Sequence, residues 1–397
     1  MRIGIDCRMF SSGFTGIGRY TFELVKNLEK ISIKDPEHQH QYVLFFNKDA
    51  FSKFTPTAPN FEKVEVDAPH YSFKEQTSFL KALNAQKLDL MHFTHFNAPI
   101  RYKKPFIVTI HDLTHTLFPG RKMTALPYRL AYKAVVKSAV SKAKKIIAVS
   151  ENTKQDLIKI HHVPSHKIEV VYEGANADYY KFTPEQEQQA EARLKEKYNI
   201  TRPFLLYTGV HRYHKNLPRL IEAFEILTTE SADQSENSDD SQFAQANLSK
   251  DLSLVITGKK DPFYPEVEQE VAVRNLTSKV NFPGFVSEQD LISLYNIAEV
   301  YVFPSLYEGF GLPILEAMQC GTPVAASNVS SIPEVAGADN ALFFDPESPQ
   351  DIVQKITQIL ADEQLSASLR EKGLQRVKAF SWAKMANEIL DIYNQAA

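Results

Sequence analysis

Two glutamates eight positions apart, Glu308 and Glu316, enclose a short loop that contains two glycines. Gly309 and Gly311 have no side chains, so the backbone can approach a ligand as closely as a phosphate group requires. Carboxylates accept hydrogen bonds and therefore suit the hydroxyl groups of a sugar. The loop favours a ligand that carries both phosphate and sugar, and the alternative is an ordinary turn between a strand and a helix.

A proline follows the glycines and indicates where the next helix starts. Pro313 is well tolerated at the first position of a helix, so we expect a helix to begin at this point. Its first amide groups, from about Ile314 and Leu315, would remain free to bind an anion. The apolar run at residues 300–303 is the strand expected to carry the loop.

Apolar runs alternate with helical patterns along the whole chain, which predicts an α/β protein with two doubly wound parallel sheets. The strands expected in the first sheet are residues 2–6, 41–46, 88–93, 106–110, 145–149 and 168–172. Those expected in the second sheet are residues 204–208, 252–257, 280–282, 300–303, 323–326 and 341–344.

We place the N-terminal domain at residues 1–182 and the C-terminal domain at residues 183–378, because a polar segment separates the two sets of strands. The acidic, low-complexity stretch 229–251 is expected to be a disordered insertion. Residues 379–397 form a final amphipathic helix that must dock elsewhere. Its apolar face consists of Trp382, Met385, Ile389 and Ile392.

The chain has 397 residues and a near-neutral net charge of −3. Its two cysteines, Cys7 and Cys320, exclude a disulfide framework and favour a reducing compartment. No apolar stretch is long enough to cross a bilayer, and the N-terminus does not resemble a secretion signal. We therefore expect a cytoplasmic protein.

The glutamate loop resembles the E-x7-E motif of the family 4 retaining glycosyltransferases. Further similarities to that family occur in order along nearly the whole chain, and together they are most similar to the mannosyltransferase-like branch that assembles bacterial surface polysaccharides. They lie at residues 16–20 (GIGRY), 109–113 (TIHDL), 148–151 (AVSE), 207–209 (YTG) with 215–216 (KN), 320–324 (CGTPV) and 332–335 (IPEV).

The resemblance implies the GT-B fold, in which two Rossmann-like domains enclose the active site in an interdomain cleft. The C-terminal helix then returns to the N-terminal domain, which binds the acceptor, while the C-terminal domain binds the nucleotide sugar. The implied reaction moves a hexose, most simply mannose from GDP-mannose, onto a saccharide or lipid-linked glycan with retention of configuration. A UDP-hexose donor is the alternative. No cofactor and no metal ion are implied.

The resemblance also assigns roles to individual residues. Glu308 would bind hydroxyl groups of the donor sugar, Glu316 the ribose of the nucleotide, and Lys215 the departing diphosphate. His111 would lie over the donor sugar. The other residues expected to bind the donor are Gly16, Gly18, Gly209, Arg212, Gly309, Phe310, Gly311 and Leu312.

The sequence departs from the family pattern next to Lys215. The preceding position, commonly arginine in the family, is His214, and an arginine stands at Arg212 instead. Arginine stays charged and grips phosphate with two donors, whereas a histidine is only partly charged at neutral pH. We expect Arg212 to take over the phosphate contact.

Several histidines close in sequence leave a metal site as an alternative interpretation. His92 and His95 flank a short loop, and His111, Asp112 and His115 follow the next predicted strand. Such groups can bind transition metals. No DxD-type carboxylate pair accompanies them, so we favour a metal-independent site.

The charges are unevenly distributed. Residues 1–182 hold 27 Lys and Arg against 17 Asp and Glu, and the remainder holds 18 against 31. Arg129, Lys133 and Lys137 recur every four residues on a predicted helix, with Tyr128 and Tyr132 beside them. This pattern favours adsorption to the anionic inner face of a membrane, and an ordinary solvated face is the alternative. No nucleic-acid-binding motif accompanies it.

The sequence disfavours two other classes of function. A nicotinamide-dependent oxidoreductase is disfavoured because the first loop reads Gly13-x2-Gly16-x-Gly18 rather than G-x-G-x-x-G. A non-catalytic protein that only binds sugar nucleotides is disfavoured by the complete set of His111, Lys215, Glu308 and Glu316.

Overall fold

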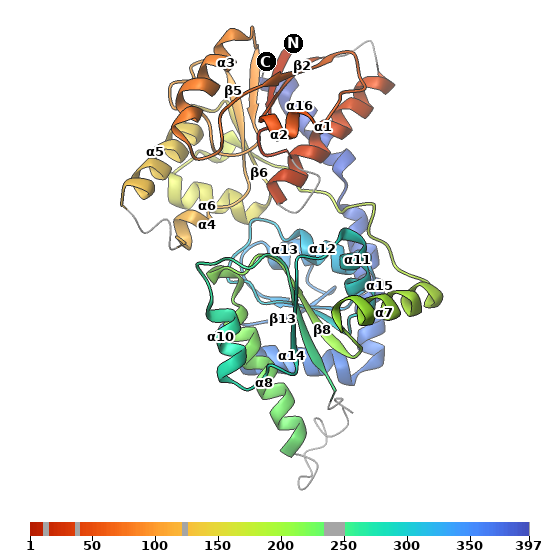
Figure 1. The fold of residues 1–397 in the computed structure, drawn as a ribbon. Coiled ribbons are helices and arrows are strands. Elements are labelled where there is room, and N and C mark those ends of the chain that lie inside the picture. Colours follow the sequence, from red (N-terminus) through yellow and green to blue (C-terminus); the bar gives the residue numbers. More distant parts are fainter. Residues whose placement is uncertain (11–15, 36–39, 121–125, 234–250, 397) are drawn as a thin grey trace. The chain divides into compact units, whose positions relative to one another are not determined.

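The computed structural model describes residues 1–10, 16–35, 40–120, 126–233 and 251–396, and the chain divides into two compact units (Figure 1). The first unit combines Met1–Gly174 with Phe380–Ala397, and the second is Ala175–Ala379. Gly13 and most of the acidic stretch at 229–251 lie outside the described residues.

The two units divide after Gly174 rather than after residue 182 as the sequence placed the boundary. Residues 175–182 belong to the second unit because they bond to it: the Phe182 amide donates to Asn296 Oδ1 at 2.7 Å, and Asn296 Nδ2 donates to the Tyr180 carbonyl at 3.0 Å. The expected insertion also starts later, since helix α8 (Leu217–Asp233) includes residues 229–233.

A parallel sheet with strand order β3-β2-β1-β4-β5-β6-β7 forms the centre of the first unit. All six predicted strands are confirmed within two residues at each end, and β3 is an additional edge strand. The strands are β1 (Arg2–Asp6), β2 (Gln41–Phe46), β3 (Phe61–Glu65), β4 (Leu90–Phe93), β5 (Phe106–Ile110), β6 (Lys145–Ala148) and β7 (Ile168–Val170). The helices are α1 (Gly16–Lys34), α2 (Lys48–Phe51), η1 (Glu75–Phe79), α3 (Leu80–Ala85), α4 (Thr114–Leu117), α5 (Leu126–Lys142), α6 (Glu151–His161), η3 (Ser165–Lys167) and α16 (Trp382–Ala396).

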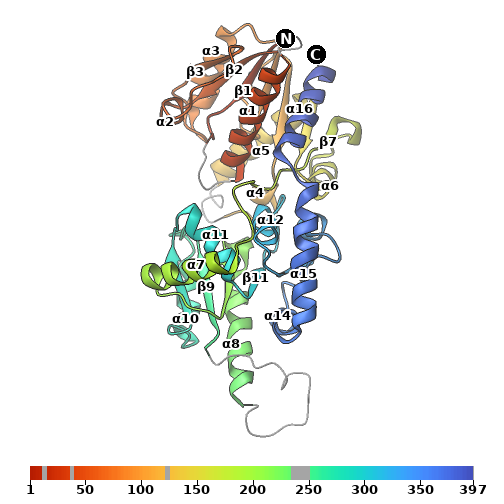
Figure 2. The same ribbon diagram turned by 90° about the vertical axis from the view of Figure 1, so that its right-hand side faces the viewer.

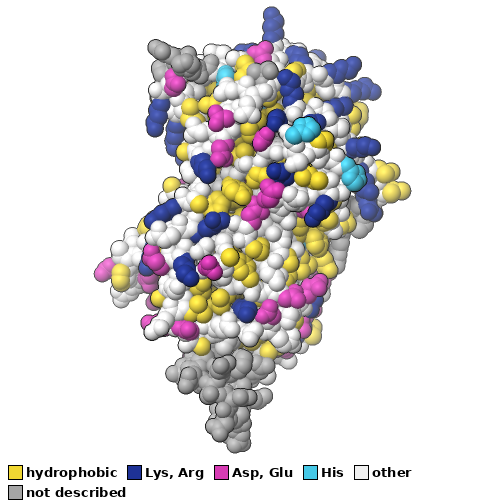
Figure 3. Space-filling view, turned by 180° about the vertical axis from the view of Figure 1, so that it is seen from behind, with side chains coloured by type: hydrophobic (Ala, Val, Ile, Leu, Met, Phe, Trp, Pro, Cys, Tyr) yellow, Lys and Arg dark blue, Asp and Glu magenta, His cyan; other side chains and the backbone are white. Residues whose placement is uncertain are grey.

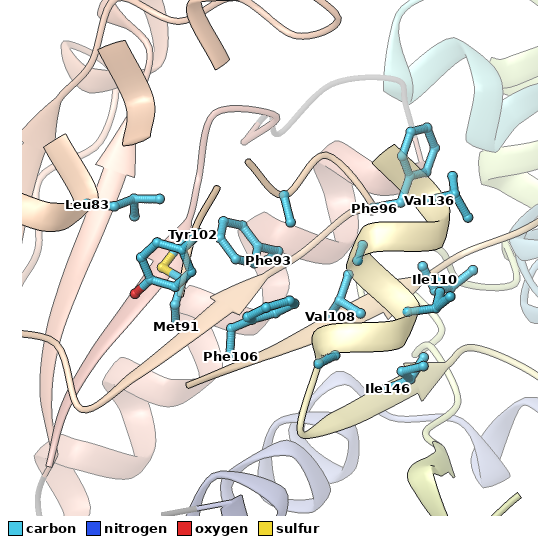
Figure 4. Packing of buried hydrophobic residues seen from close by; sticks show 14 of the residues in the cluster. Leu83, Met91, Phe93, Phe96, Tyr102, Phe106, Val108, Ile110, Val136 and Ile146 are labelled. Atoms are coloured by element: carbon cyan, nitrogen blue, oxygen red, sulfur yellow. The ribbon is translucent and has the colours of Figure 1, made fainter. Parts of the chain in front are cut away.

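Aromatic side chains fill the space between one face of this sheet and its helices (Figure 4). The Phe93 ring meets the Phe106 ring edge-on at 5.3 Å and the Tyr102 ring at 5.7 Å. Val136 of α5 is buried in the same cluster. Each such buried side chain contributes roughly 1.5–3 kcal/mol, so this core fixes the sheet whose strand ends carry the polar residues described below.

The last helix, α16, packs against α1 in the first unit, as the two views in Figures 1 and 2 show. The predicted apolar face is confirmed, because Trp382, Met385, Ile389 and Ile392 are all buried. A buried hydrogen bond of 2.7 Å between the Tyr393 hydroxyl and His92 Nδ1 ties this helix to β4. The returning helix is therefore an integral part of the first unit.

The second unit is built on a parallel sheet of order β10-β9-β8-β11-β12-β13. The strands are β8 (Phe204–Thr208), β9 (Ser253–Thr257), β10 (Val280–Gly284), β11 (Val300–Phe303), β12 (Val324–Ser327) and β13 (Leu342–Phe344). Besides α8, the helices are α7 (Pro184–Tyr198), η4 (Tyr213–Lys215), α10 (Glu266–Val273), α11 (Glu288–Ile297), α12 (Leu312–Gln319), α13 (Ile332–Ala336), α14 (Pro349–Ala361), α15 (Glu363–Arg376) and η5 (Val377–Ala379).

Both cysteines, Cys7 and Cys320, are buried and free. Within the described ranges, every helix is too short or too polar to cross a bilayer.

Candidate active site

The glutamate loop lies at the carboxyl end of β11 and leads directly into α12. Gly311 precedes the helix with a φ of 115°, a backbone conformation that residues with side chains rarely adopt. The Ile314 amide donates to the Gly311 carbonyl at 3.0 Å. This bond closes the first turn, so Ile314 is removed from the amides predicted to be free, and Leu312 rather than Pro313 is the first helical residue.

Lys215 and Glu308 form an ion pair in the second unit. Lys215 Nζ lies 2.6 Å from Oε1 and 2.8 Å from Oε2 of Glu308. The side chains are 18% and 13% exposed, so solvent screens the pair only weakly. Two residues that the sequence separates by about a quarter of the chain are therefore brought together in one site.

Two serines that the sequence reasoning missed fix the backbone of this loop. Ser330 Oγ donates to the Glu308 carbonyl at 2.6 Å. Ser331 Oγ lies 3.0 Å from the same carbonyl and 2.9 Å from that of Phe310. These bonds hold the segment that includes Gly309 against the turn before α13, and the Phe310 side chain is buried. In the sequence, the two consecutive serines before Ile332 were the feature that could have indicated these hydrogen bonds.

Glu316, in the middle of α12, is connected to a buried group of hydroxyls. The Tyr295 hydroxyl donates to Glu316 Oε2 at 3.0 Å and lies 2.8 Å from Thr208 Oγ1. Tyr301 reaches the same threonine at 3.1 Å. Burial raises the pKa of Tyr295 well above its usual value, so its hydroxyl stays protonated and donates to the carboxylate. Glu316 is thus held in position at the end of β8.

Arg212 and His214 occupy different environments around η4. Arg212 is half-exposed, and its Nε lies 3.6 Å from Asp261 Oδ2. His214 is buried, and its carbonyl accepts a hydrogen bond of 2.8 Å from the Leu306 amide. Arg212 is accessible to a ligand and His214 supports the loop before Glu308.

The backbones that follow β8 and β9 lie in direct contact. A Cβ on Gly258 would lie 2.0 Å from the Gly209 carbonyl oxygen, and Gly258 itself has a φ of +130°. Gly209 donates to the Thr257 carbonyl at 3.0 Å. Gly209 was predicted from the sequence, whereas Gly258 was not, although it follows a strand just as Gly209 does.

His111 stands at the carboxyl end of β5 in the first unit, as predicted. Its Nδ1 lies 3.1 Å from Glu173 Oε1, and its Nε2 lies 2.9 Å from the Thr94 carbonyl oxygen. The Tyr20 ring of α1 contacts the imidazole edge-on at 4.8 Å. The ring is therefore held by groups from the ends of two other strands, β4 and β7, and from one helix.

Gly16 and Gly18 lie in the first turn of α1 and not in the preceding loop. Gly16 is exposed with open space around it, and Gly18 is buried.

Two other histidines of the first unit, His92 and His95, are bonded to protein groups. His92 Nδ1 and Nε2 lie 2.7 Å from the Tyr393 hydroxyl and 2.8 Å from Thr109 Oγ1. His95 Nδ1 bonds to the Asn97 side chain. Burial lowers the pKa of both histidines to about 3, with a further contribution from the charge of His111. In the part of the chain that the structure describes, no group of three or more metal-binding side chains converges.

Helix α5 presents Arg129, Lys133 and Lys137 to solvent, next to the exposed Tyr128. Tyr132 differs from the prediction: it is buried, and its hydroxyl lies 2.9 Å from Thr116 Oγ1. It is a core residue because it occupies the side of α5 that faces the sheet.

Both halves of the chain match protein-family models, one described as glycosyl transferases group 1 over residues 188–376 and one as glycosyltransferase family 4 over residues 14–179. The O-antigen chain mannosyltransferase B of Escherichia coli is 27% identical over 401 residues, 96% of each chain. The serotype-specific mannosyltransferase WbdA of Escherichia coli is 30% identical over 72% of this chain and 33% of its own length. The sucrose-phosphate synthase of Thermosynechococcus elongatus superposes with a TM-score of 0.75 at 22% identity, covering 99% of this chain and 98% of that one.

Two parallel-sheet α/β units with a C-terminal helix that returns to the first define the GT-B fold. With both halves matched, the chain belongs to the family 4 glycosyltransferases. It is therefore a transferase enzyme, as the sequence predicted.

Proposed function

We propose that the enzyme transfers mannose from GDP-mannose to a saccharide or lipid-linked glycan, with retention of anomeric configuration. The observation that carries this proposal is the Lys215–Glu308 ion pair beside the glycine-capped helix α12. A cation and a carboxylate in one site match the two halves of a nucleotide sugar, because the cation attracts diphosphate and the carboxylate accepts from sugar hydroxyls. The O-antigen mannosyltransferase that aligns over 96% of the chain supports mannose as the sugar.

In this proposal each residue has one task. Glu308 releases Lys215 and accepts hydrogen bonds from hydroxyl groups of the donor sugar. Lys215 and Arg212 neutralise the diphosphate. Glu316 accepts from the ribose, and amides of the loop through Gly311 and Leu312 contact the donor. His111 contacts the donor sugar.

Chemistry then proceeds by front-face attack. The bond between the anomeric carbon and the diphosphate oxygen breaks as the acceptor hydroxyl forms the new glycosidic bond. The proton of that hydroxyl passes to the departing diphosphate oxygen. Lys215 stabilises the negative charge that develops there, which is where a fixed cation lowers the barrier most. Since fixed side chains supply this charge, we propose that the reaction needs no resident metal ion, and turnover should persist in EDTA.

The donor is tested by thermal-shift measurements of the whole protein with GDP-, UDP-, ADP- and dTDP-sugars. GDP-mannose should raise the melting temperature most. The enzyme should then transfer mannose from it to a mannooligosaccharide, and the NMR spectrum of the product should show an axial glycosidic bond. Transfer from a UDP-hexose instead would overturn the donor assignment. Donor binding with neither hydrolysis nor transfer would favour the non-catalytic alternative.

We also propose that α5 adsorbs to an anionic membrane surface. The specific observation is that Leu126, Tyr128 and Leu130 are exposed by 65%, 68% and 57% next to the exposed cation Arg129. Apolar and aromatic side chains among cations suit the headgroup region, where each cation contributes about 1 kcal/mol. Figure 3 shows that Lys and Arg side chains also project along the edges of the first unit.

Flotation with vesicles that contain phosphatidylglycerol tests this proposal at low and high salt. The protein should float at low salt and remain at the bottom at high salt. The combined variant Arg129→Ser, Lys133→Ser and Lys137→Ser should lose flotation. Absence of the wild-type protein from the vesicle fraction at low salt would contradict the proposal.

A further inference from the structure

Glu173 is a buried carboxylate at the carboxyl end of β7, and its side chain is only 5% exposed. Its ion-pair partner among the described residues is His111, with Nδ1 3.1 Å from Oε1. Burying a carboxylate is costly unless it is paired. The Glu173 carboxylate can only accept, so its position calls for a hydrogen on Nδ1 of His111.

The hydrogen-bond partners of His111 fix where its protons lie. Nε2 faces the Thr94 carbonyl, which can only accept, so Nε2 carries a hydrogen. Nδ1 faces the Glu173 carboxylate, so one further proton must lie between those two atoms. A carboxylic acid is ordinarily a much stronger acid than an imidazolium ion, and this places the proton on the ring. His111 is then a doubly protonated imidazolium held between two acceptors.

The other ionisable groups around His111 agree with this charge. The His95 ring stacks against it at 6.2 Å, and both His95 and His92 are kept neutral because burial lowers each pKa to about 3. Burial alone would raise the pKa of Asp112. Hydrogen bonds from Thr114, with a further contribution from His111, outweigh it, so Asp112 is an anion with a lowered pKa.

Tyr20, whose ring contacts the imidazole edge-on, stays neutral because burial raises its pKa. Of the imidazoles of His92, His95 and His111, it is the His111 ring that bonds to a carboxylate, that of Glu173.

Close packing behind Glu173 holds its backbone in place. A Cβ on the next residue, Gly174, would lie 2.2 Å from the Trp382 amide nitrogen and 2.6 Å from the Trp382 ring. The chain entering α16 therefore rests directly on the backbone that carries the carboxylate. The docking of α16 therefore restricts the position of Glu173 and, through its hydrogen bond, that of the His111 ring.

We propose that Glu173 is a positioning residue that keeps His111 doubly protonated, so that neither ring nitrogen can take a proton from the acceptor. His111 then acts as a fixed, charged group, and the acceptor proton has to leave on the diphosphate oxygen. This inference rests on the proposed function for its catalytic meaning, but the protonation of the ring can be measured without any activity.

Nuclear magnetic resonance of the full chain labelled with 15N-histidine tests the protonation directly. The ring signals of His111, assigned with the variant His111→Asn, should show hydrogen on both nitrogens at pH 7 in the wild type. In Glu173→Gln, Nδ1 should lose its hydrogen at the same pH. A wild-type ring with one bare nitrogen, or identical spectra for the wild type and Glu173→Gln, would overturn the proposal. Trp382 fluorescence reports whether each variant is folded.

The pH profile of transfer supplies a readout that a merely structural role would not move. Glu173→Gln should shift the alkaline limb of kcat/KM downward by on the order of one pH unit, with activity recovering toward acid pH. For Glu173→Asp, the alkaline limb of kcat/KM should lie between those of the wild type and Glu173→Gln. The control is Glu169→Gln on β7, the strand that precedes Glu173, which removes a surface carboxylate paired with Lys145 at 2.6 Å and should leave the profile unchanged.

A loss of activity that is equal at every pH would contradict the proposal. If the wild type transfers no mannose but both His111 nitrogens are protonated, the proposed function fails while the role of Glu173 as the proton-holding partner stands.

Discussion

Lys215 donates hydrogen bonds to both carboxylate oxygens of Glu308, at 2.6 and 2.8 Å. Each group neutralises the other in a site that is largely shielded from solvent. A diphosphate would attract the lysine and sugar hydroxyls would satisfy the glutamate, so one nucleotide sugar can replace both halves of the pair. The pairing keeps either charge from standing alone, which would be costly at this burial.

The two glutamates of the loop should fail in different ways when truncated. Glu308→Ala should lower kcat by on the order of 100-fold, because the reacting sugar loses a contact that matters in the transition state. Glu316→Ala should raise the KM for the donor by about 10-fold with kcat near the wild-type value, because it removes a contact that stabilises the bound donor and the transition state equally. Steady-state kinetics with varied donor separate the two, and the opposite pattern would reverse the assigned roles.

Arg212 and His214 should also separate by kinetics. Arg212→Ala should raise the donor KM by about 10-fold, since a charge-assisted contact to phosphate is lost. His214→Ala removes a buried side chain and should lower the free energy of unfolding by roughly 1–3 kcal/mol with little effect on the donor KM. Donor affinity that survives Arg212→Ala and collapses in His214→Ala would show that His214 takes the phosphate contact.

Acid should destabilise the first unit through its buried histidines. The pKa of His92 and of His95 is about 3 in the folded protein and ordinarily 6.5. Below pH 6.5 the unfolded chain therefore binds protons that the folded chain does not. The free energy of unfolding should fall by about 1.4 kcal/mol per pH unit for each histidine, down toward pH 3.

Urea unfolding followed by Trp382 fluorescence measures this effect, because the chain has one tryptophan and it lies in the first unit. His92→Gln should reduce the slope of the free energy of unfolding against pH by the equivalent of about one proton. The exposed His166 provides the control, as His166→Gln should leave the slope unchanged. An equal slope in His92→Gln and the wild type would contradict the assignment.

The contact between Gly258 and Gly209 should make Gly258→Ala strongly destabilising. A Cβ at 2.0 Å from the Gly209 carbonyl forces the backbone apart, at a cost on the order of 3 kcal/mol, and should also raise the donor KM. Gly284→Ala is the matched control: its φ is also positive, at +72°, but a Cβ there meets open space. It should cost only about 1 kcal/mol. Calorimetry of both variants checks the difference, and equal losses would show that clash is not the cause.

Most of the fold could be predicted because its signals are local. Apolar runs of strand length define the twelve predicted strands, and each of them is present with its ends shifted by at most two residues. The edge strand β3 was not predicted because three of its five residues are charged, so it lacks a continuous apolar run. The sequence also did not predict the division after Gly174. That division depends on hydrogen bonds such as the one from Phe182 to Asn296, which link residues far apart in the chain.

By itself, the sequence determined the family and the chemical types in the site, because Glu308, Glu316, Lys215 and His111 stand in motifs whose order and spacing are local properties of the chain. Only the tertiary structure decided their partners. Glu308 pairs with Lys215, Glu316 with Tyr295, and His111 with Glu173. Each pair joins the ends or flanking helices of different strands of a sheet, and sheet order is set by the packing of the whole core. Charge state and proton position follow from those partners, so they are properties of the fold.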